Sequence, residues 1–348
     1  MDGRNAWASR LRLSDREHTM TTRPTIVVTD YSFPDLALEQ AVAEQGGCTL
    51  LGHHCNSEAE LIAAVAGADA VITQFAKLNA QVIAAMARAR AIVRYGIGVD
   101  NVDLDAARAH GIPVSNIPDY CIDEVADHTL ALMLGLTRQV VTHNNDLRDG
   151  QWRLAVPVTG MRVLREQTVG VVGFGRIGRE VVARLLAFKC RVLVHDPVLP
   201  EHAITAAGAV PVSLGQLLAQ ADIVSLHCPS TSATRRMLRT ETLAGMKRGA
   251  LLVNVARGDL VDTDALVDAL RSGQLAGAAL DVFDPEPLPS DHPLRGLPNA
   301  IVAPHIASVS PTAVRALREG AANRAVAAAH GQLPANIVNA VAQPRLQP

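Results

Sequence analysis

The sequence predicts an α/β protein with two doubly wound parallel sheets, each covered by helices on both faces. From Thr25 onward, short apolar runs rich in β-branched residues alternate with helical patterns at intervals of roughly 20–30 residues, which is typical of βαβ units. An aperiodic stretch, residues 144–166, divides these runs into two series. The 348 residues, of which 49% are hydrophobic, are enough to bury two cores.

The first series contains five expected strands. Each is a short apolar run, and helical patterns lie between them. Among these helices, residues 80–89 are rich in alanine and contain few helix breakers. The strands are expected at residues 25–29, 49–53, 70–73, 91–95 and 114–116.

A long helix and an arm follow the first series. Residues 122–142 predict one helix, which opens on Asp123 and Glu124 as the positive end of a helix dipole favours. Residues 144–166 then lose the helical period. Because Trp152 and several valines in this stretch need cover, we interpret it as an extended arm and not as disorder.

The second series contains six expected strands, and helices separate the first five of them. These strands are expected at residues 169–172, 191–195, 223–227, 250–255, 277–282 and 300–303. Residues 311–330 are rich in alanine and predict a final helix.

Composition argues against several classes of function. The formal net charge of −2 gives no strong attraction to nucleic acid or to anionic membranes. No stretch reaches the about 18–20 uncharged apolar residues of a membrane helix. The five cysteines show no metal-ligand spacing, which favours reduced thiols and a cytoplasmic location. His53, His54 and Cys55 resemble a metal cluster, but a loop or strand end without metal is the favoured interpretation.

The first twenty residues are expected to form a flexible extension. They combine arginines with acidic residues and lack the apolar core of a secretory signal. The compact protein is therefore expected to begin near Met20.

A glycine motif indicates a dinucleotide site. Residues 173–178 read Gly-Phe-Gly-Arg-Ile-Gly between an expected strand and an expected helix, so that glycines and a helix N-terminus would face a pyrophosphate. Asp196 ends the next strand, where a carboxylate would bind the ribose hydroxyls of NAD and repel the extra phosphate of NADP. The alternative is a structural glycine turn followed by a solvated aspartate.

Polar residues follow four further strands of the second series. They stand in residues 227–229, 254–258, 281–287 and 304–308, and the carboxyl ends of parallel strands share one edge of a sheet. Arg257, Glu286 and His305 would then gather at the nicotinamide end of the site. Taken singly, they could be a surface arginine, a solvated charge and a hydrogen-bonded loop histidine.

Together these three side chains fit the reduction of a 2-keto acid. Arginine offers a planar fork to a carboxylate, and histidine is a suitable proton donor to a developing alkoxide. A carboxylate beside the histidine would stabilise its protonated form and fix its ring. With NAD as the hydride carrier, the pattern predicts an oxidoreductase that transfers a hydride to and from C2 of a small 2-hydroxy or 2-keto acid.

With these motifs the chain resembles the D-isomer-specific 2-hydroxyacid dehydrogenases, especially the branch with phosphoglycerate dehydrogenases and C-terminal-binding-protein-like chains. Five motifs in order carry the resemblance, which runs from about residue 25 to residue 339. They lie at residues 94–103, 173–178, 252–258, 279–287 and 304–308.

The resemblance implies two Rossmann-like domains, with the cofactor domain inserted into the substrate domain. The implied limits are residues 21–118 and 307–342 for the substrate domain, and 119–306 for the NAD domain. It also implies a homodimer in which the arm at residues 144–166 reaches across to the partner.

The resemblance assigns roles to individual residues. Arg257, Glu286 and His305 become the catalytic set, and Asp281 is expected to meet the nicotinamide amide. The substrate contacts are expected at Arg94, Gly96, Ile97, Gly98 and Arg257. The cofactor contacts are expected at Gly173, Gly175, Arg176, Ile177, Gly178, Asp196, His227, Cys228, Pro229, Val255, Ala256, Arg257, Asp281 and His305.

Two departures from the branch matter. Gln74 and Phe75 stand where phosphoglycerate dehydrogenases usually carry a basic residue, which speaks against a phosphorylated substrate. The chain also ends soon after Asn339, without the regulatory module that some of these enzymes append. A second hypothesis is an NAD-sensing scaffold like the C-terminal-binding corepressors, which would bind NADH and reduce keto acids feebly.

Overall fold

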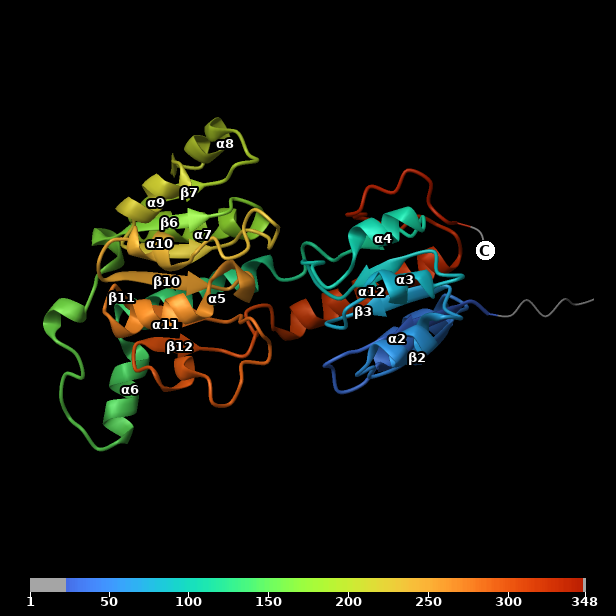
Figure 1. The fold of residues 1–348 in the computed structure, drawn as a ribbon, viewed down its shortest axis with the longest axis horizontal. Helices are drawn as coiled ribbons and strands as arrows, with labels where there is room; N and C mark the ends of the chain where they lie inside the picture. Colours follow the sequence, from blue (N-terminus) through green and yellow to red (C-terminus); the bar gives the residue numbers. More distant parts are fainter. Residues whose placement is uncertain (1–22, 347–348) are drawn as a thin grey trace, which may run out of the picture.

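Two parallel sheets lie side by side in separate lobes of the chain (Figure 1). The computed structural model describes residues 23–346, and the expected extension at residues 1–20 lies outside them. The two sheets and their helices confirm the predicted fold class.

The small lobe contains a five-stranded sheet in the order β2-β1-β3-β4-β5. Its helices α1 (Ala37–Gln45) and α12 (Pro311–Ala329) cover one face, and α2 (Glu58–Val65), α3 (Ala80–Ala84) and α4 (Leu104–Ala109) cover the other. The strands are β1 (Thr25–Val28), β2 (Thr49–Gly52), β3 (Ala70–Thr73), β4 (Ile92–Arg94) and β5 (Val114–Ser115).

The large lobe contains a seven-stranded sheet in the order β12-β11-β10-β9-β6-β7-β8. One core lies beneath α5 (Ile122–Thr137) and α7 (Arg176–Ala187), and a second beneath α9 (Leu214–Gln220), α10 (Thr240–Ala244) and α11 (Thr263–Arg271). The strands are β6 (Thr168–Val172), β7 (Arg191–His195), β8 (Val210–Pro211), β9 (Ile223–Leu226), β10 (Ala250–Asn254), β11 (Leu275–Leu280) and β12 (Ala300–Val302). The short helix α8 (Glu201–Ala206) leads into β8.

The strand order places a topological switch point between β6 and β9. The chain starts at β6, moves outward through β7 and β8, and then returns to β9 on the other side of β6. The loops after β6 and β9 therefore run in opposite directions and leave a crevice at the carboxyl edge of the sheet. This crevice faces the small lobe.

The chain crosses between the lobes twice, from β5 into α5 and from β12 into α12 (Figure 1). Ser310 lies at the second crossing and connects its two sides. Its hydroxyl accepts a hydrogen bond from the Ala313 amide, which caps α12, and donates one to Glu124 on α5. We propose that the inserted NAD domain begins and ends at these crossings, at residues 119 and 306.

The structure corrects four details of the sequence prediction. The strand expected at residues 277–282 lies two residues earlier, as β11 (Leu275–Leu280), because Leu275 pairs with Ala250 at the start of β10. The helix expected at residues 122–142 is broken, because Gln139 takes a left-handed conformation (φ 53°) between α5 and α6 (Val140–Arg148). The helix expected at residues 80–89 ends at Ala84, where the Met86 amide bonds to the Ile83 carbonyl and the chain turns back toward β4. β8 was not expected, because it contains only two residues.

The arm at residues 144–166 is partly helical. It begins within α6 and contains two 3₁₀ turns, Val158–Gly160 and Leu164–Glu166. Trp152 is 92% exposed, so the cover that we expected for it is not supplied by the described part of this chain. Within residues 23–346, no helix combines the length and the apolar character that crossing a membrane requires.

Candidate active site

A cavity of about 580 Å³ lies between the lobes, at the switch point of the large sheet. Both lobes line it, which brings together residues that are far apart in the sequence. The predicted residues among its lining are Arg94, Ile97, Gly98, Gly175, Arg176, Ile177, His227, Cys228, Pro229, Val255, Ala256, Arg257, Asp281 and His305. The predicted residues that do not line it are Gly96, Gly173, Gly178, Asp196 and Glu286.

The glycine turn fits a pyrophosphate. Gly173 has a φ of 95°, and a Cβ added there would lie 2.7 Å from the backbone of His227 and Cys228. A Cβ at Gly178 would lie 2.2 Å from the Gly173 carbonyl oxygen, whereas nothing lies within 4 Å of one at Gly175. Two glycines thus allow close packing of strand and helix, and the third leaves open space in front of the N-terminus of α7, where amide groups attract phosphate.

Asp196 binds the glycine turn itself. Its Oδ2 accepts a hydrogen bond from the Phe174 amide (2.7 Å), and its Oδ1 accepts from the amides of Val198 and Leu199 (2.9 and 3.0 Å). Partial burial raises the pKa of Asp196, but these amide donors lower it further, and the pKa lies below its ordinary value. Asp196 is therefore ionised at neutral pH, and Oδ2 retains a lone pair for a ribose hydroxyl.

His305 and Glu286 form a pair at the same edge. His305 Nδ1 lies 2.8 Å from Glu286 Oε2, and Glu286 Oε1 accepts a hydrogen bond from the Phe283 amide at 2.7 Å. Burial raises the pKa of Glu286, but the hydrogen bond and charge of His305 outweigh it, so this pKa lies below its usual range. Because Nδ1 is engaged, Nε2 is the ring nitrogen free to exchange a proton with a substrate.

Asp281 fixes the loop that carries His305. Its side chain is fully buried, and its two oxygens accept hydrogen bonds from the Ile306 and Ala307 amides at 2.9 and 2.8 Å. His305 takes a left-handed conformation (φ 54°) just before these two amides, so the carboxylate stabilises an unusual backbone. The contact between Asp281 and the nicotinamide amide stays a prediction.

Arg257 follows β10 and reaches the small lobe. Its Nε donates to Asp100 Oδ1 at 2.8 Å, and its Nη1 donates to the Ala256 carbonyl at 2.7 Å. The Asn254 side chain fixes the turn by donating to the Arg257 carbonyl at 2.8 Å. A Cβ added at Gly258 would lie 1.9 Å from the Phe283 carbonyl carbon, so this turn packs directly against the loop that leads to Glu286.

Arg94 lies at the end of β4 and is 9% exposed. Its Nε is buried without a hydrogen-bond partner. Burial lowers the pKa of Arg94 to about 10, so the side chain still carries its charge at neutral pH. A Cβ added at Gly96 would lie 1.4 Å from Arg94 Nη1, and one at Gly98 would lie 1.6 Å from Arg257 Nη2. These two glycines therefore leave room for both guanidinium groups.

His227 is neutral. Burial lowers its pKa to about 4, and Nε2 lies 2.8 Å from the Ser225 hydroxyl. Its ring shapes the wall of the cavity without adding charge, which separates its role from that of His305.

Sequence reasoning gave no role to several polar residues that line the cavity, among them Asp100, Asn116, Tyr120 and Ser308. The available signals were the motifs at residues 94–103 and 304–308, which contain Asp100 and Ser308. Tyr120 and Asn116 lie near the crossing between the lobes, and burial raises the pKa of Tyr120 to about 12, so it stays a hydrogen-bond donor. Among the described residues, no group of three potential metal ligands gathers.

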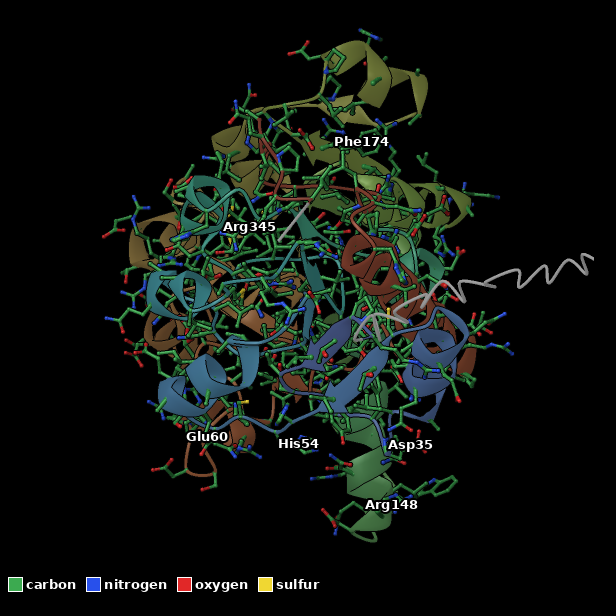
Figure 2. The ribbon with its side chains drawn as sticks, turned by 90° about the vertical axis from the view of Figure 1, so that its right-hand side faces the viewer. Asp35, His54, Glu60, Arg148, Phe174 and Arg345 are labelled. Carbon is green, nitrogen blue, oxygen red and sulfur yellow. The ribbon has the colours of Figure 1, made fainter. Side chains whose placement is uncertain are left out.

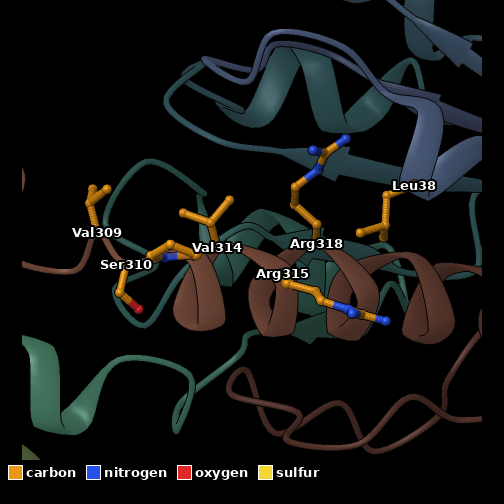
Figure 3. A pocket seen from close by; sticks show the side chains of 7 residues that line it. Leu38, Val309, Ser310, Val314, Arg315 and Arg318 are labelled. Carbon is orange, nitrogen blue, oxygen red and sulfur yellow. The ribbon is translucent and has the colours of Figure 1, made fainter.

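A second hollow lies beside the start of α12, and its lining includes Leu38 of α1 together with Val314 and Arg318 of α12 (Figure 3). Its Arg318 is engaged with the buried Glu39 of α1 at 2.6 Å. None of the predicted site residues lines this hollow, so it is separate from the candidate active site.

Comparison with known proteins gives a consistent result. The family model "D-isomer specific 2-hydroxyacid dehydrogenase, NAD binding domain" matches residues 130–307. A glyoxylate reductase of Korarchaeum cryptofilum is 38% identical over 81% of this chain and 86% of its own length. A D-3-phosphoglycerate dehydrogenase of Mycobacterium leprae is 42% identical over 71% of this chain, which spans only 46% of that relative.

A solved structure is similar to this chain over nearly its whole length. The D-lactate dehydrogenase of Aquifex aeolicus, complexed with NAD and lactic acid, has a TM-score of 0.80 at 29% identity. The similarity covers 93% of this chain and 99% of that one.

Proposed function

The chain belongs to the D-isomer specific 2-hydroxyacid dehydrogenase family, and on that premise we propose that it reduces a small, unphosphorylated 2-keto acid such as glyoxylate, with Arg257, His305 and Glu286 as its catalytic set. The family and its NAD-binding domain establish the coarser activity, an NAD-dependent oxidoreductase that interconverts 2-hydroxy and 2-keto acids. The observation that carries the residue roles is the His305–Glu286 pair, whose side chains are 2.8 Å apart and whose His305 lines the same cavity as Arg257.

Each residue has a distinct task. The Arg257 guanidinium binds the substrate carboxylate and orients the carbonyl toward His305. Protonated His305 donates from Nε2 to the oxygen as it becomes a hydroxyl, and Glu286 stabilises the protonated ring through Nδ1. NADH bound along the glycine turn supplies the hydride to C2. In the reverse direction, neutral His305 takes the proton from the hydroxyl.

The residues beside His305 support an unphosphorylated substrate. Phe75 lies edge-on to the His305 ring, with 6.1 Å between ring centroids. The Gln74 side chain is engaged with Ser32, accepting from its amide at 2.7 Å and donating to its hydroxyl at 3.0 Å. Neither residue offers a cation to a phosphate group.

The decisive experiment is a turnover screen with NADH and glyoxylate, hydroxypyruvate, pyruvate and phenylpyruvate. An enzyme should oxidise NADH with at least one of them, whereas a corepressor-like scaffold should bind NADH with feeble turnover. The names of the relatives above give no support to the scaffold hypothesis. NADH binding without turnover on any keto acid would overturn the proposal.

We expect a strong preference for NADH over NADPH, because the ionised Asp196 would face the added phosphate. Repulsion between the Asp196 carboxylate and the 2′-phosphate should lower kcat/KM for NADPH roughly ten- to thousandfold. Asp196→Ser should narrow that gap, since the serine hydroxyl still accepts a hydrogen bond without carrying charge. Glu201→Gln, on the first turn of α8, is the control and should keep the gap. Equal kcat/KM for the two cofactors in the parent would contradict this role.

We further propose a cytoplasmic homodimer. All five cysteines are free, as expected in a reducing compartment. Exposed apolar side chains concentrate on α6 and the arm, which stand away from the body of the lobe; Figure 2 shows Arg148 near the far end of α6. A monomer rarely exposes so many apolar residues in one region, so the arm is the natural dimer contact. The exposed apolar side chains of α6 and the arm are those of Val140, Val141, Leu147, Trp152, Leu154, Val158 and Val163.

Trp152→Asp should convert the dimer to a monomer, because a buried unpaired charge at an interface costs several kcal/mol. Sedimentation at micromolar concentration measures the change. Val198→Asp, at an exposed position far from the arm, is the matched control and should remain dimeric. A parent chain that sediments as a monomer would refute the homodimer.

A further inference from the structure

One ion pair bridges the two lobes across the active-site cavity. Asp100 comes from the loop between β4 and α4, and Arg257 comes from the end of β10, 157 positions later. Arg257 Nε and Asp100 Oδ1 are 2.8 Å apart. Burial raises the pKa of Asp100, but the Arg257 charge and hydrogen bond lower it to below its ordinary value, so the pair is ionised.

The pair leaves one edge of Arg257 available. Nε and Nη1 donate to protein oxygens, whereas Nη2 lies over Gly98, where an added Cβ would be only 1.6 Å away. A Cβ at position 98 would also lie 2.9 Å from Asp100 Oδ1. Both Arg257 and Asp100 therefore require a glycine at position 98. A substrate carboxylate can thus reach the outer edge of Arg257 while Asp100 neutralises its charge.

Arg94 has no such partner. It forms no ion pair with any described residue, and its Nε is buried without a hydrogen-bond partner. Asp30, the carboxylate after β1, accepts from the amides of Gln74, Phe75 and Ala76 instead. The charges of Asp30 and Asp100 act on Arg94 only without direct contact. A largely buried guanidinium without a paired carboxylate is costly, so this position favours an incoming anion.

The remaining charged groups at this end of the cavity compensate one another or face elsewhere. Glu286 is paired with His305. Asp281 is fully buried against the Ile306 and Ala307 amides, with the His128 ring 3.7 Å away. Arg176 opens α7 at the cofactor end. Among the described residues at this end of the cavity, Arg94 is therefore the cation that no ion pair engages.

We propose that Asp100 determines which substrate charge the site prefers: because Asp100 pairs with Arg257, Arg94 is left as the cation without an ion pair, and the site selects 2-keto acids that carry a single negative charge over those that carry two. The inference rests on the proposed function and adds a specificity-determining residue to it. A second carboxylate or a phosphate would enter without a counter-cation and next to Asp100, which penalises dianions by repulsion as well as by lost pairing.

The test compares substrates of one shape and two charges. Oxaloacetate carries two carboxylates, and 2-oxosuccinamate replaces the distal one by an amide of nearly the same size. The parent should show a kcat/KM at least about tenfold higher for the amide. Asp100→Asn keeps an oxygen for Arg257 Nε and removes the charge, so it should lower this ratio by about tenfold or more. Asp100→Glu restores the charge and should keep a ratio near that of the parent.

Two controls keep the result interpretable. Asp105→Asn removes an exposed carboxylate that pairs with Arg108 on α4, and it should leave the ratio unchanged. Malonate and malonamate, as competitive inhibitors against glyoxylate, give the same comparison from inhibition constants without requiring turnover of either compound.

The outcomes separate the two proposals. If the parent reduces no 2-keto acid, the proposed function fails. If the parent reduces keto acids but treats the two probes alike, or if Asp100→Asn leaves the ratio where it was, the proposed function stands and the role of Asp100 is wrong.

Discussion

Replacing His305 by alanine should lower kcat for keto-acid reduction by about 10²–10⁴-fold, because the developing alkoxide loses its proton donor. NADH binding should persist, since we propose that the cofactor is held mainly by the glycine turn and by Asp196, which bonds to that turn. Single-turnover oxidation of NADH, together with fluorescence titration of NADH, separates the two effects. A kcat within a few-fold of the parent would show that another group supplies the proton.

Glu286→Gln tests the pairing of Glu286 with His305 while leaving the imidazole in place. In the parent, the hydrogen bond and charge of His305 lower the pKa of Glu286, which shows that the two charges attract each other. The glutamine amide carries no charge, so the protonated ring loses this attraction. Reduction requires protonated His305, and its rate should therefore fall off at a lower pH than in the parent. Oxidation requires neutral His305, so its acidic limb should move down as well. Profiles that stay in place would leave Glu286 as an ordinary loop charge.

The positions of most strands could be predicted from the sequence, because a short β-branched run between polar residues has few alternatives. β3 (Ala70–Thr73) and β7 (Arg191–His195) have the predicted bounds. The convergence of Arg257 and His305 also followed from a general property: parallel strands end at one edge of their sheet, and the polar residues that follow them meet there.

The break at Gln139 could not be predicted. No glycine or proline interrupts the pattern there, and the turn depends on contacts with distant parts of the chain. The Arg162 amide bonds to the Thr137 carbonyl at 2.9 Å, which brings the arm back to the end of α5. Local propensity carries no information about such a tertiary contact.

Asp100 escaped sequence reasoning for a related reason. Its partner Arg257 lies on the other lobe. Neither the hydrophobic pattern nor the motif at residues 94–103 predicts how the two lobes pack against each other. Arg94 was expected to bind substrate, but its lack of a counter-charge became visible only when the surrounding carboxylates were located. Charge balance within a pocket is a property of the assembled fold.

Arg257→Ala should have the largest effect on kcat/KM, a loss of about 10³–10⁴-fold, through both constants. KM rises because the outer edge of the guanidinium no longer binds the carboxylate, and kcat falls because the same contact orients the carbonyl toward His305. The loss exceeds that of one hydrogen-bonded pair, since Asp100 is left without its cation and now offsets the charge of Arg94. Steady-state kinetics with glyoxylate and NADH measures both constants.

A double variant isolates that last contribution. In Arg257→Ala, the further change Asp100→Ala removes the unpaired carboxylate, so Arg94 recovers its net charge and KM should fall back part of the way while kcat stays low. Arg257→Lys should recover less kcat than KM, because a point charge attracts the carboxylate without the planar fork that fixes its orientation. If Arg257→Ala raised KM alone and left kcat intact, Arg257 would bind the substrate without orienting it. If the double variant were no better than Arg257→Ala, Asp100 would have no influence on the charge that the substrate meets.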